Sequence, residues 1–131
     1  MIILDTHCWL WWLSDPDLLS QNAKQVLENA VAEDQAMVSS ISVWEVAMLV
    51  SRGRLQLSMT TEEWIAEAER QPGIRFVPVT NRVAHRAVDL PGTFHPDPAD
   101  RIIVATALVH GATVVTKDGK IRGYRQVQSI W

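Results

Sequence analysis

The sequence has little cysteine, no repeats and no long uncharged apolar run. Its single cysteine, Cys8, excludes an internal disulfide and predicts a small core residue in the reducing cytoplasm. The apolar stretch Met1–Leu13 carries Asp5 and His7, lacks a basic leader and is too short to span a bilayer, so no membrane association is expected. Without repeats, low-complexity tracts or a linker, residues 1–131 are predicted to form one domain.

An excess of basic residues is also missing. The formal net charge is −3, so no global positive field indicates nucleic-acid binding. Four carboxylates neutralised at a metal site would leave the remainder of the chain at +1. The acidic balance therefore argues only weakly against a polyanionic substrate.

Short apolar segments alternate with segments of helical length. This alternation predicts a three-layer α/β/α fold with a mainly parallel central sheet. The expected strands are Met1–Leu4, Ala36–Ser40, Ile74–Val79, Ala112–Thr116 and an edge strand within Gln126–Trp131. The expected helices are His7–Leu13, the segment from Ser20 to Val31, Ile41–Val50, Thr60–Arg70, the segment from Thr80 to Leu90, and the segment from Asp97 to His110. Ser20, Thr60 and Thr80 are expected N-caps.

Four acids occupy positions that this fold can bring together. Asp5 follows the first strand and Asp118 follows the Ala112–Thr116 strand, while Glu45 and Asp100 interrupt apolar helical segments. Sites in parallel sheets form at the carboxyl ends of strands, and a carboxylate among core residues is costly unless it is paired or binds a metal. Hard oxygen ligands favour Mg²⁺ or Mn²⁺, and no Cys/His spacing indicates zinc.

Each acid also has a structural explanation. Asp5 and Asp118 fit helix N-caps or turn formers, and Asp100 fits the first turn of a helix, where the dipole favours negative charge. Glu45 is harder to explain in this way because Val43, Trp44, Val46 and Ala47 surround it.

Two other classes of protein with acidic sites fit this sequence poorly. A phosphatase of the haloacid dehalogenase type needs an Asp two residues after Asp5, where His7 stands. A phosphoacceptor receiver domain needs paired acids after the first strand and an Asp closing a central strand, but Ser39-Ser40 ends the second strand.

Four segments resemble PIN-domain nucleases, in the family's order, and within them the VapC-type toxins of toxin–antitoxin pairs. They are LDTH, SSISVWEVAMLVSRGRLQL, FHPDPADRIIVATAL and VVTKD. The resemblance implies a single PIN-like domain and an Mg²⁺- or Mn²⁺-dependent endoribonuclease that is held inactive by a cognate antitoxin and forms a homodimer. It assigns Asp5, Glu45, Asp100 and Asp118 as catalytic metal ligands, with Asp97 as a peripheral or alternative acid. The alternative is a non-catalytic PIN-like module that binds RNA or protein.

Neighbouring polar residues are candidates for supporting roles. Thr6 and Thr116 can hydrogen-bond the carboxylates, as can Ser40 or Ser42 near Glu45. Arg101 follows an acid and can contact phosphate or pair with Asp97 or Asp100. A basic rim for the RNA backbone is predicted at Arg52, Arg54, Lys117, Lys120, Arg122 and Arg125. The four histidines match no ligand spacing and are interpreted as structural, with His7 and His95 the least certain.

Tryptophan is abundant near the amino terminus. Trp9, Trp11 and Trp12 occupy three of four consecutive positions, so one face of a helix cannot bury them all. At least one is expected to line an apolar surface that a partner covers. With the family resemblance, this predicts an antitoxin groove or a homodimer surface; the alternative is a wide core helix with one Trp half exposed.

Overall fold

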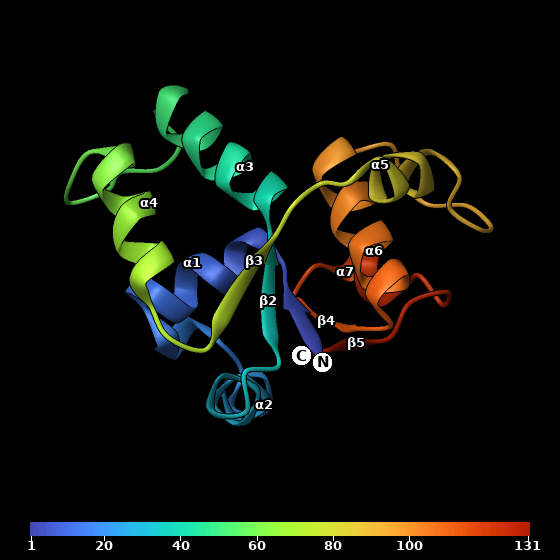
Figure 1. Ribbon diagram of the computed structural model, residues 1–131, viewed down its shortest axis with the longest axis horizontal. Coiled ribbons are helices and arrows are strands. Elements are labelled where there is room, and N and C mark those ends of the chain that lie inside the picture. The colour runs from blue at the N-terminus through green and yellow to red at the C-terminus, as the bar shows by residue number, and fades with distance from the viewer.

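The computed structural model describes residues 1–131 and contains five strands, all parallel, in the order β3-β2-β1-β4-β5 (Figure 1). The strands are β1 (Ile2–Leu4), β2 (Ala36–Ser39), β3 (Ile74–Val77), β4 (Thr113–Val115) and β5 (Ser129–Ile130). The helices are α1 (Thr6–Ser14), α2 (Gln21–Ala32), α3 (Ser40–Ser51), α4 (Thr61–Arg70), α5 (Asn81–Val88), α6 (Pro98–His110) and α7 (Gly119–Arg122), with a 3₁₀ turn at Pro16–Leu18. The predicted α/β fold with a parallel sheet is confirmed.

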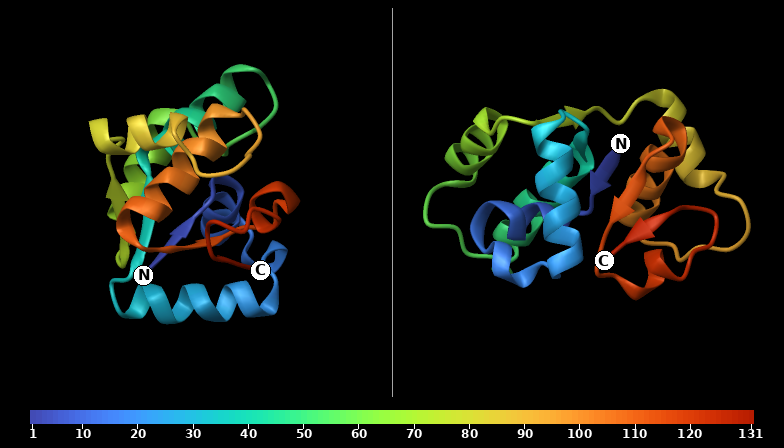
Figure 2. Two further views of the ribbon diagram at one scale, coloured as in Figure 1. Left: turned by 90° about the vertical axis from the view of Figure 1, so that its right-hand side faces the viewer. Right: turned by 90° about the horizontal axis from the view of Figure 1, so that it is seen from below.

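Alternating side chains of the central strands build two cores, one on each face of the sheet. Ile2 and Leu4 of β1 face the core formed with α1, α2 and α4, whereas Ile3 between them faces the core formed with α5 and α6. In Figure 1, α1 and α4 lie on one side of the strands and α5 and α6 on the other. Both turned views in Figure 2 show α2 as a straight helix that lies outside the strands. The expected three layers are therefore present.

The element boundaries follow from local chemistry. Ser20, Thr60 and Thr80 each accept a hydrogen bond from a backbone N–H of the first helical turn, as predicted. The second strand ends at Ser39, one residue earlier than predicted, because the Ser39 hydroxyl caps α3. The third strand stops at Val77, since Pro78 has no N–H for the ladder. The four-residue helix α7 and the 3₁₀ turn were not expected.

The position of β1 determines where a site can form. β1 pairs with β2 on one side and with β4 on the other. The strands that follow β1 in the chain are therefore added first on one side of it and then on the other, while all strands stay parallel. Such a switch point opens a crevice beyond the carboxyl ends of the strands. Asp5 follows β1 at this end and Thr116 follows β4. None of the helices combines the length and the hydropathy that a membrane crossing requires.

Candidate active site

A polar hollow of about 270 Å³ lies at this switch point, and no hydrophobic residue lines it. Its lining includes all four acids that the sequence singled out, together with the peripheral acid and one lysine. The lining residues are Asp5, Thr6, His7, Glu45, His95, Asp97, Asp100, Asp118 and Lys120. No lysine or arginine lies within ion-pair distance of these acids. The acidic side chains of this hollow therefore concentrate negative charge that no ion pair with lysine or arginine offsets.

Asp5 is the most deeply placed acid, with 7% of its surface exposed. As the N-cap of α1, it accepts a hydrogen bond from the backbone N–H of Cys8 to Oδ1 at 2.8 Å. Its Oδ2 accepts a hydrogen bond from the Thr116 hydroxyl. These two contacts fix the carboxylate, and each oxygen keeps a lone pair for another partner. Thr116 thus has the contact that was proposed for it.

Glu45 reaches the hollow from the second turn of α3. Its carboxylate accepts a hydrogen bond from the Thr6 hydroxyl, whose oxygen lies 2.8 Å from the Ser42 hydroxyl oxygen. Because the Thr6 hydroxyl has one proton, Ser42 donates to Thr6 when Thr6 donates to Glu45. Ser40 is exposed and contacts no acid, so the serine beside this acid is Ser42.

Asp97 and Asp100 come from the start of α6. Asp97 is the N-cap of the helix and accepts a hydrogen bond from the Asp100 N–H at 3.1 Å, so its carboxylate has a structural task. Burial, and then the charges of Asp97, Asp118, Glu45 and Asp5, raise the pKa of Asp100 to about 7. The Asp100 carboxyl therefore responds to every other acid of the cluster.

Asp118 caps α7 and lies close to a histidine, His95. Its carboxylate accepts a hydrogen bond from the Lys120 N–H at 3.4 Å. Possible ligand atoms of Asp118, Asp100 and His95 all lie within 4.8 Å of one another. Nε2 of His95 is buried and lies 3.1 Å from Oδ2 of Asp100, without the alignment of a hydrogen bond. His95 therefore lines the site beside two of the acids, although no ligand spacing in the sequence singled it out.

Arg101 departs from its expected role. Instead of pairing with Asp97 or Asp100, its guanidinium donates hydrogen bonds to four backbone carbonyl oxygens, those of Ala87, Val88, Phe94 and His95. The side chain thereby ties α6 to the end of α5 and to the loop that carries His95. Arg101 holds the site's wall in place and forms no ion pair with the acids.

The expected basic rim is only partly present, and the Cys8 thiol is not activated as a nucleophile. Of the six basic residues proposed for the rim, only Lys120 lines the acidic hollow. Lys117 lies over the rings of Trp11 and Trp131 instead. Burial, with the nearby Asp5 carboxylate, strongly raises the pKa of the Cys8 thiol. The thiol therefore stays protonated and belongs to the core, as predicted.

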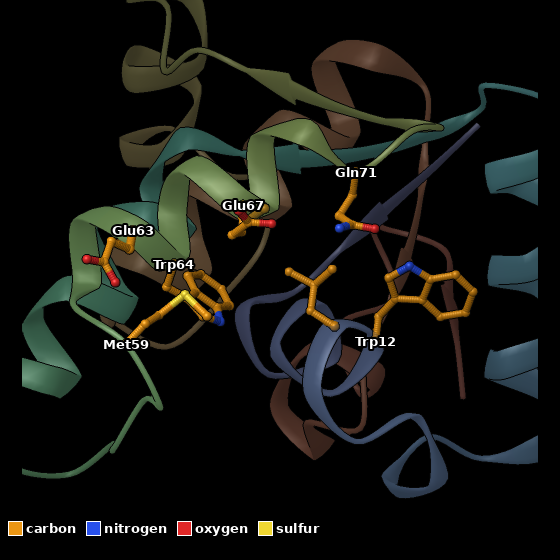
Figure 3. Close-up of a pocket in the computed structure, with 8 residues that line it drawn as sticks. Trp12, Met59, Glu63, Trp64, Glu67 and Gln71 are labelled. Atoms are coloured by element: carbon orange, nitrogen blue, oxygen red, sulfur yellow. The ribbon is translucent and has the colours of Figure 1, made fainter.

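A larger hollow of about 690 Å³ lies between α1 and α4 and shares no lining residue with the acidic hollow (Figure 3). Trp12, Met59 and Trp64 line it together with Leu13 and Ala68, and Glu63, Glu67 and Gln71 complete its wall. Trp9 is fully buried, whereas Trp11 and Trp12 are half-buried. The prediction that the helix cannot bury all three rings is confirmed.

Residues 2–126 match the PIN domain family. The chain belongs to this family. Ribonuclease VapC22 of Mycobacterium tuberculosis is 39% identical to this PIN domain over 129 residues, which cover 98% of this chain and 95% of that protein. Among solved structures, FitAcB from Neisseria gonorrhoeae matches with a TM-score of 0.68 and 26% identity, and a toxin–antitoxin complex from Klebsiella pneumoniae with 0.67 and 19%. Each match covers 100% of this chain and 97% of the other. The PIN-like fold that the sequence motifs implied is confirmed.

Proposed function

We propose that this PIN-domain protein is a metal-dependent endoribonuclease and the toxin of a toxin–antitoxin pair. The observation that carries the proposal is the convergence of Asp5, Glu45, Asp100 and Asp118 in one polar hollow, with no lysine or arginine within ion-pair distance of them. A binding scaffold gains nothing from four acids that repel one another, whereas a metal-dependent hydrolase needs them. The relative named ribonuclease VapC22, at 39% identity, supports the same chemistry.

The acidic hollow fits Mg²⁺ or Mn²⁺. Its four principal donors are carboxylates, which these hard cations prefer, and a bound cation would relieve the repulsion from neighbouring acids that contributes to the raised pKa of Asp100. Asp5, Glu45, Asp100 and Asp118 would hold the ion, with Asp97 at the edge. When bound, the cation supplies Lewis acidity toward a phosphate oxygen and lowers the pKa of water, so that hydrolysis needs no protein nucleophile.

The remaining residues keep these donors in place. Thr116 and the Cys8 N–H orient Asp5, and the Thr6–Ser42 pair orients Glu45. Such outer contacts typically change metal affinity 10- to 100-fold when they are removed. Lys120, the only lysine at the hollow, is placed to contact a phosphate oxygen of the substrate.

Cleavage of RNA by the purified protein tests the enzymatic part of the proposal. We expect cleavage with Mg²⁺ or Mn²⁺, none in EDTA, and none by the isosteric Asp5→Asn and Asp100→Asn variants. Glu28→Gln, which changes an exposed acid on α2, is the matched control and should cleave normally. Cleavage that persists in EDTA or in both site variants would overturn the metal site. RNA binding without cleavage would identify a non-catalytic PIN-like module.

Expression in a bacterial host tests the toxin assignment. The wild-type protein should arrest growth, and Asp100→Asn at equal expression should not. Equal growth with both proteins, when the wild type cleaves RNA in vitro, would contradict the toxin role and leave the nuclease role intact.

The larger hollow between α1 and α4, called the groove from here on, is proposed as an antitoxin-binding surface. Trp12, Met59 and Trp64 offer an apolar floor, while Glu63 and Glu67 make its rim negative (Figure 3). These features suit an antitoxin segment with an apolar anchor and basic neighbours. We expect Met59→Arg, which puts a charged side chain at an exposed position of the groove, to abolish capture of the co-expressed antitoxin without stopping RNA cleavage. Unchanged capture would exclude this groove.

A homodimer is proposed through α3. Eight of the ten residues in Ile41–Val50 are apolar, yet Val46 is the only one of these eight that is buried, and Trp44 is 53% exposed. A helix that is apolar all round is expected to be covered by protein on more than one side. Light scattering should find a dimer for the wild type and a monomer for Trp44→Glu. A monomeric wild type would refute the dimer.

A further inference from the structure

A second polar hollow, of about 390 Å³, adjoins the acidic one. The two share His95 and Lys120 in their walls, so they are neighbouring compartments of one surface depression. The further residues that line the second hollow are Gly92, Thr93, Phe94, Gly123, Tyr124, Arg125 and Gln126. Its volume lies within the range of about 300–1,000 Å³ typical of small-molecule sites.

The charge of this second hollow is opposite to that of the first. Lys120 and Arg125 line it and no carboxylate does, although the acidic compartment contains five acids. Both cations are exposed and form no ion pair. Two free cations beside an acidic cluster suit a ligand whose phosphates extend beyond the reacting one.

The floor of the hollow is aromatic. The ring of Phe94 lies 4.8 Å from that of Tyr124 and 4.4 Å from that of His95, measured between centroids. This row runs from the basic compartment to His95, beside Asp100. Phe94 is only half-buried, whereas Tyr124 is buried. A partly exposed ring next to free cations is the combination on which single-stranded nucleic acids stack an unpaired base.

The walls are fixed by the fold. Arg101 donates hydrogen bonds to the carbonyl oxygens of Phe94 and His95, and the Tyr124 hydroxyl donates to that of Pro91. Lys120 lies in the first turn of α7, two residues after the cap Asp118, so its backbone position is set relative to the acidic compartment. Because the walls are already ordered, less free energy is lost in fixing loops and side chains when a ligand binds.

We infer that this hollow binds the nucleotide next to the scissile phosphate, with its base on Phe94 and its phosphates at Lys120 and Arg125. The inference rests on the proposed ribonuclease function, because it places the reacting phosphate in the acidic compartment. The base must be unpaired to reach Phe94, so the subsite selects single-stranded over double-stranded RNA at this position.

Binding of a fluorescein-labelled 12-nucleotide single-stranded RNA tests the subsite, by anisotropy in EDTA and in the Asp100→Asn background. Lys120→Gln/Arg125→Gln removes both cations, and the matched control Arg75→Gln/Arg82→Gln removes two exposed arginines that line neither hollow. Single-strand binding changes by about 0.7 logarithmic units per phosphate contact and per tenfold change in salt. Two lost contacts therefore predict roughly 25-fold weaker binding at 0.1 M salt and a salt slope smaller by about 1.4.

The control pair should bind within about twofold of the parent, and Phe94→Leu should bind at least about fivefold more weakly because it removes the stacking face. In the cleaving protein, the Lys120/Arg125 pair should lower kcat/KM, mainly through a higher KM. Equal weakening by both double variants, or no RNA binding by the parent, would overturn the subsite. Failure of the wild type to cleave RNA refutes the nuclease proposal instead, and the anisotropy comparison still decides whether this hollow binds RNA.

Discussion

Replacing Asp100 by Asn should stabilise the metal-free protein while abolishing cleavage. The pKa of Asp100 is raised from its ordinary 3.8 to about 7, so ionising this carboxyl is harder in the folded chain than in the unfolded one. Each pKa unit corresponds to about 1.4 kcal/mol, which places the cost of holding Asp100 ionised at up to about 4 kcal/mol above pH 7. The amide of Asn carries no charge and removes this cost.

Two smaller effects reduce the expected gain. A negative charge in the first turn of α6 is stabilised by the helix dipole by about 0.3–1 kcal/mol, and the Asn amide needs new hydrogen-bond partners in a partly solvated hollow. We therefore expect a net gain of about 2 kcal/mol at pH 8 in EDTA. For a chain of this size, the gain corresponds to a rise in Tm of roughly 6–10 °C.

The pH dependence follows from the sign of the pKa change. The folded state binds the Asp100 proton more tightly, so the wild type is most stable below about pH 4 with respect to this group and loses that stability as the pH rises through about 7. The advantage of Asp100→Asn should accordingly be full at pH 8 and small at pH 5. Thermal melts of both proteins at the two pH values measure the difference, with Glu28→Gln as the control for loss of a charge. A destabilised variant at pH 8, or an equal gain at both pH values, would refute the reasoning.

Four further outcomes are expected. Mg²⁺ or Mn²⁺ at 100 times its dissociation constant should stabilise the wild type by about 2.7 kcal/mol in a thermal melt, and Asp100→Asn by much less. Thr116→Val should weaken metal binding about 10- to 100-fold in calorimetry, because Asp5 loses an orienting hydrogen bond. Arg101→Gln should lower the free energy of unfolding by about 2–4 kcal/mol in urea, since four carbonyl contacts disappear. Gly73→Ala should destabilise the fold by at least about 1 kcal/mol, because φ is +81° and the new Cβ meets the Val31 carbonyl oxygen at 2.4 Å; an unchanged melt would contradict it.

The acids of the hollow could be found from the sequence because each lies at a defined place in or after a predicted strand or helix. Asp5 and Asp118 come after short apolar runs that predict buried strands, Glu45 interrupts an apolar helix, and Asp100 lies in the first turn of another. Parallel strands bring their carboxyl ends to one edge, so the positions of these acids in the chain imply a common location.

The sequence misled where direction on a helix matters. Adjacent helical residues point about 100° apart, so Arg101 faces the loop after α5 although it follows Asp100 in the chain. Ser42 is three residues before Glu45 and shares its face of α3, whereas Ser40, five residues before, does not. These contacts are predictable only once the first residue of each helix is known.

His95 was missed for a different reason. It lies in the irregular segment between α5 and α6, where no periodicity constrains the direction of side chains. The path of this segment depends on hydrogen bonds from Arg101 and Tyr124 to its backbone carbonyls, six and 33 residues away in the chain, which no periodic pattern reveals. The basic hollow next to the acids depends on the same contacts.

The double use of three acids as helix caps has an evolutionary consequence. Asp5, Asp97 and Asp118 each cap a helix while facing the hollow. Asn caps a helix about as well as Asp, whereas Ala costs about 0.5–2 kcal/mol per cap. A single nucleotide change can turn an Asp codon into an Asn codon, so a chain of this design can lose its chemistry in one step while its scaffold stays intact. Non-catalytic descendants of such a protein are therefore expected to carry Asn at these caps, and sequence surveys of the family can look for that signature.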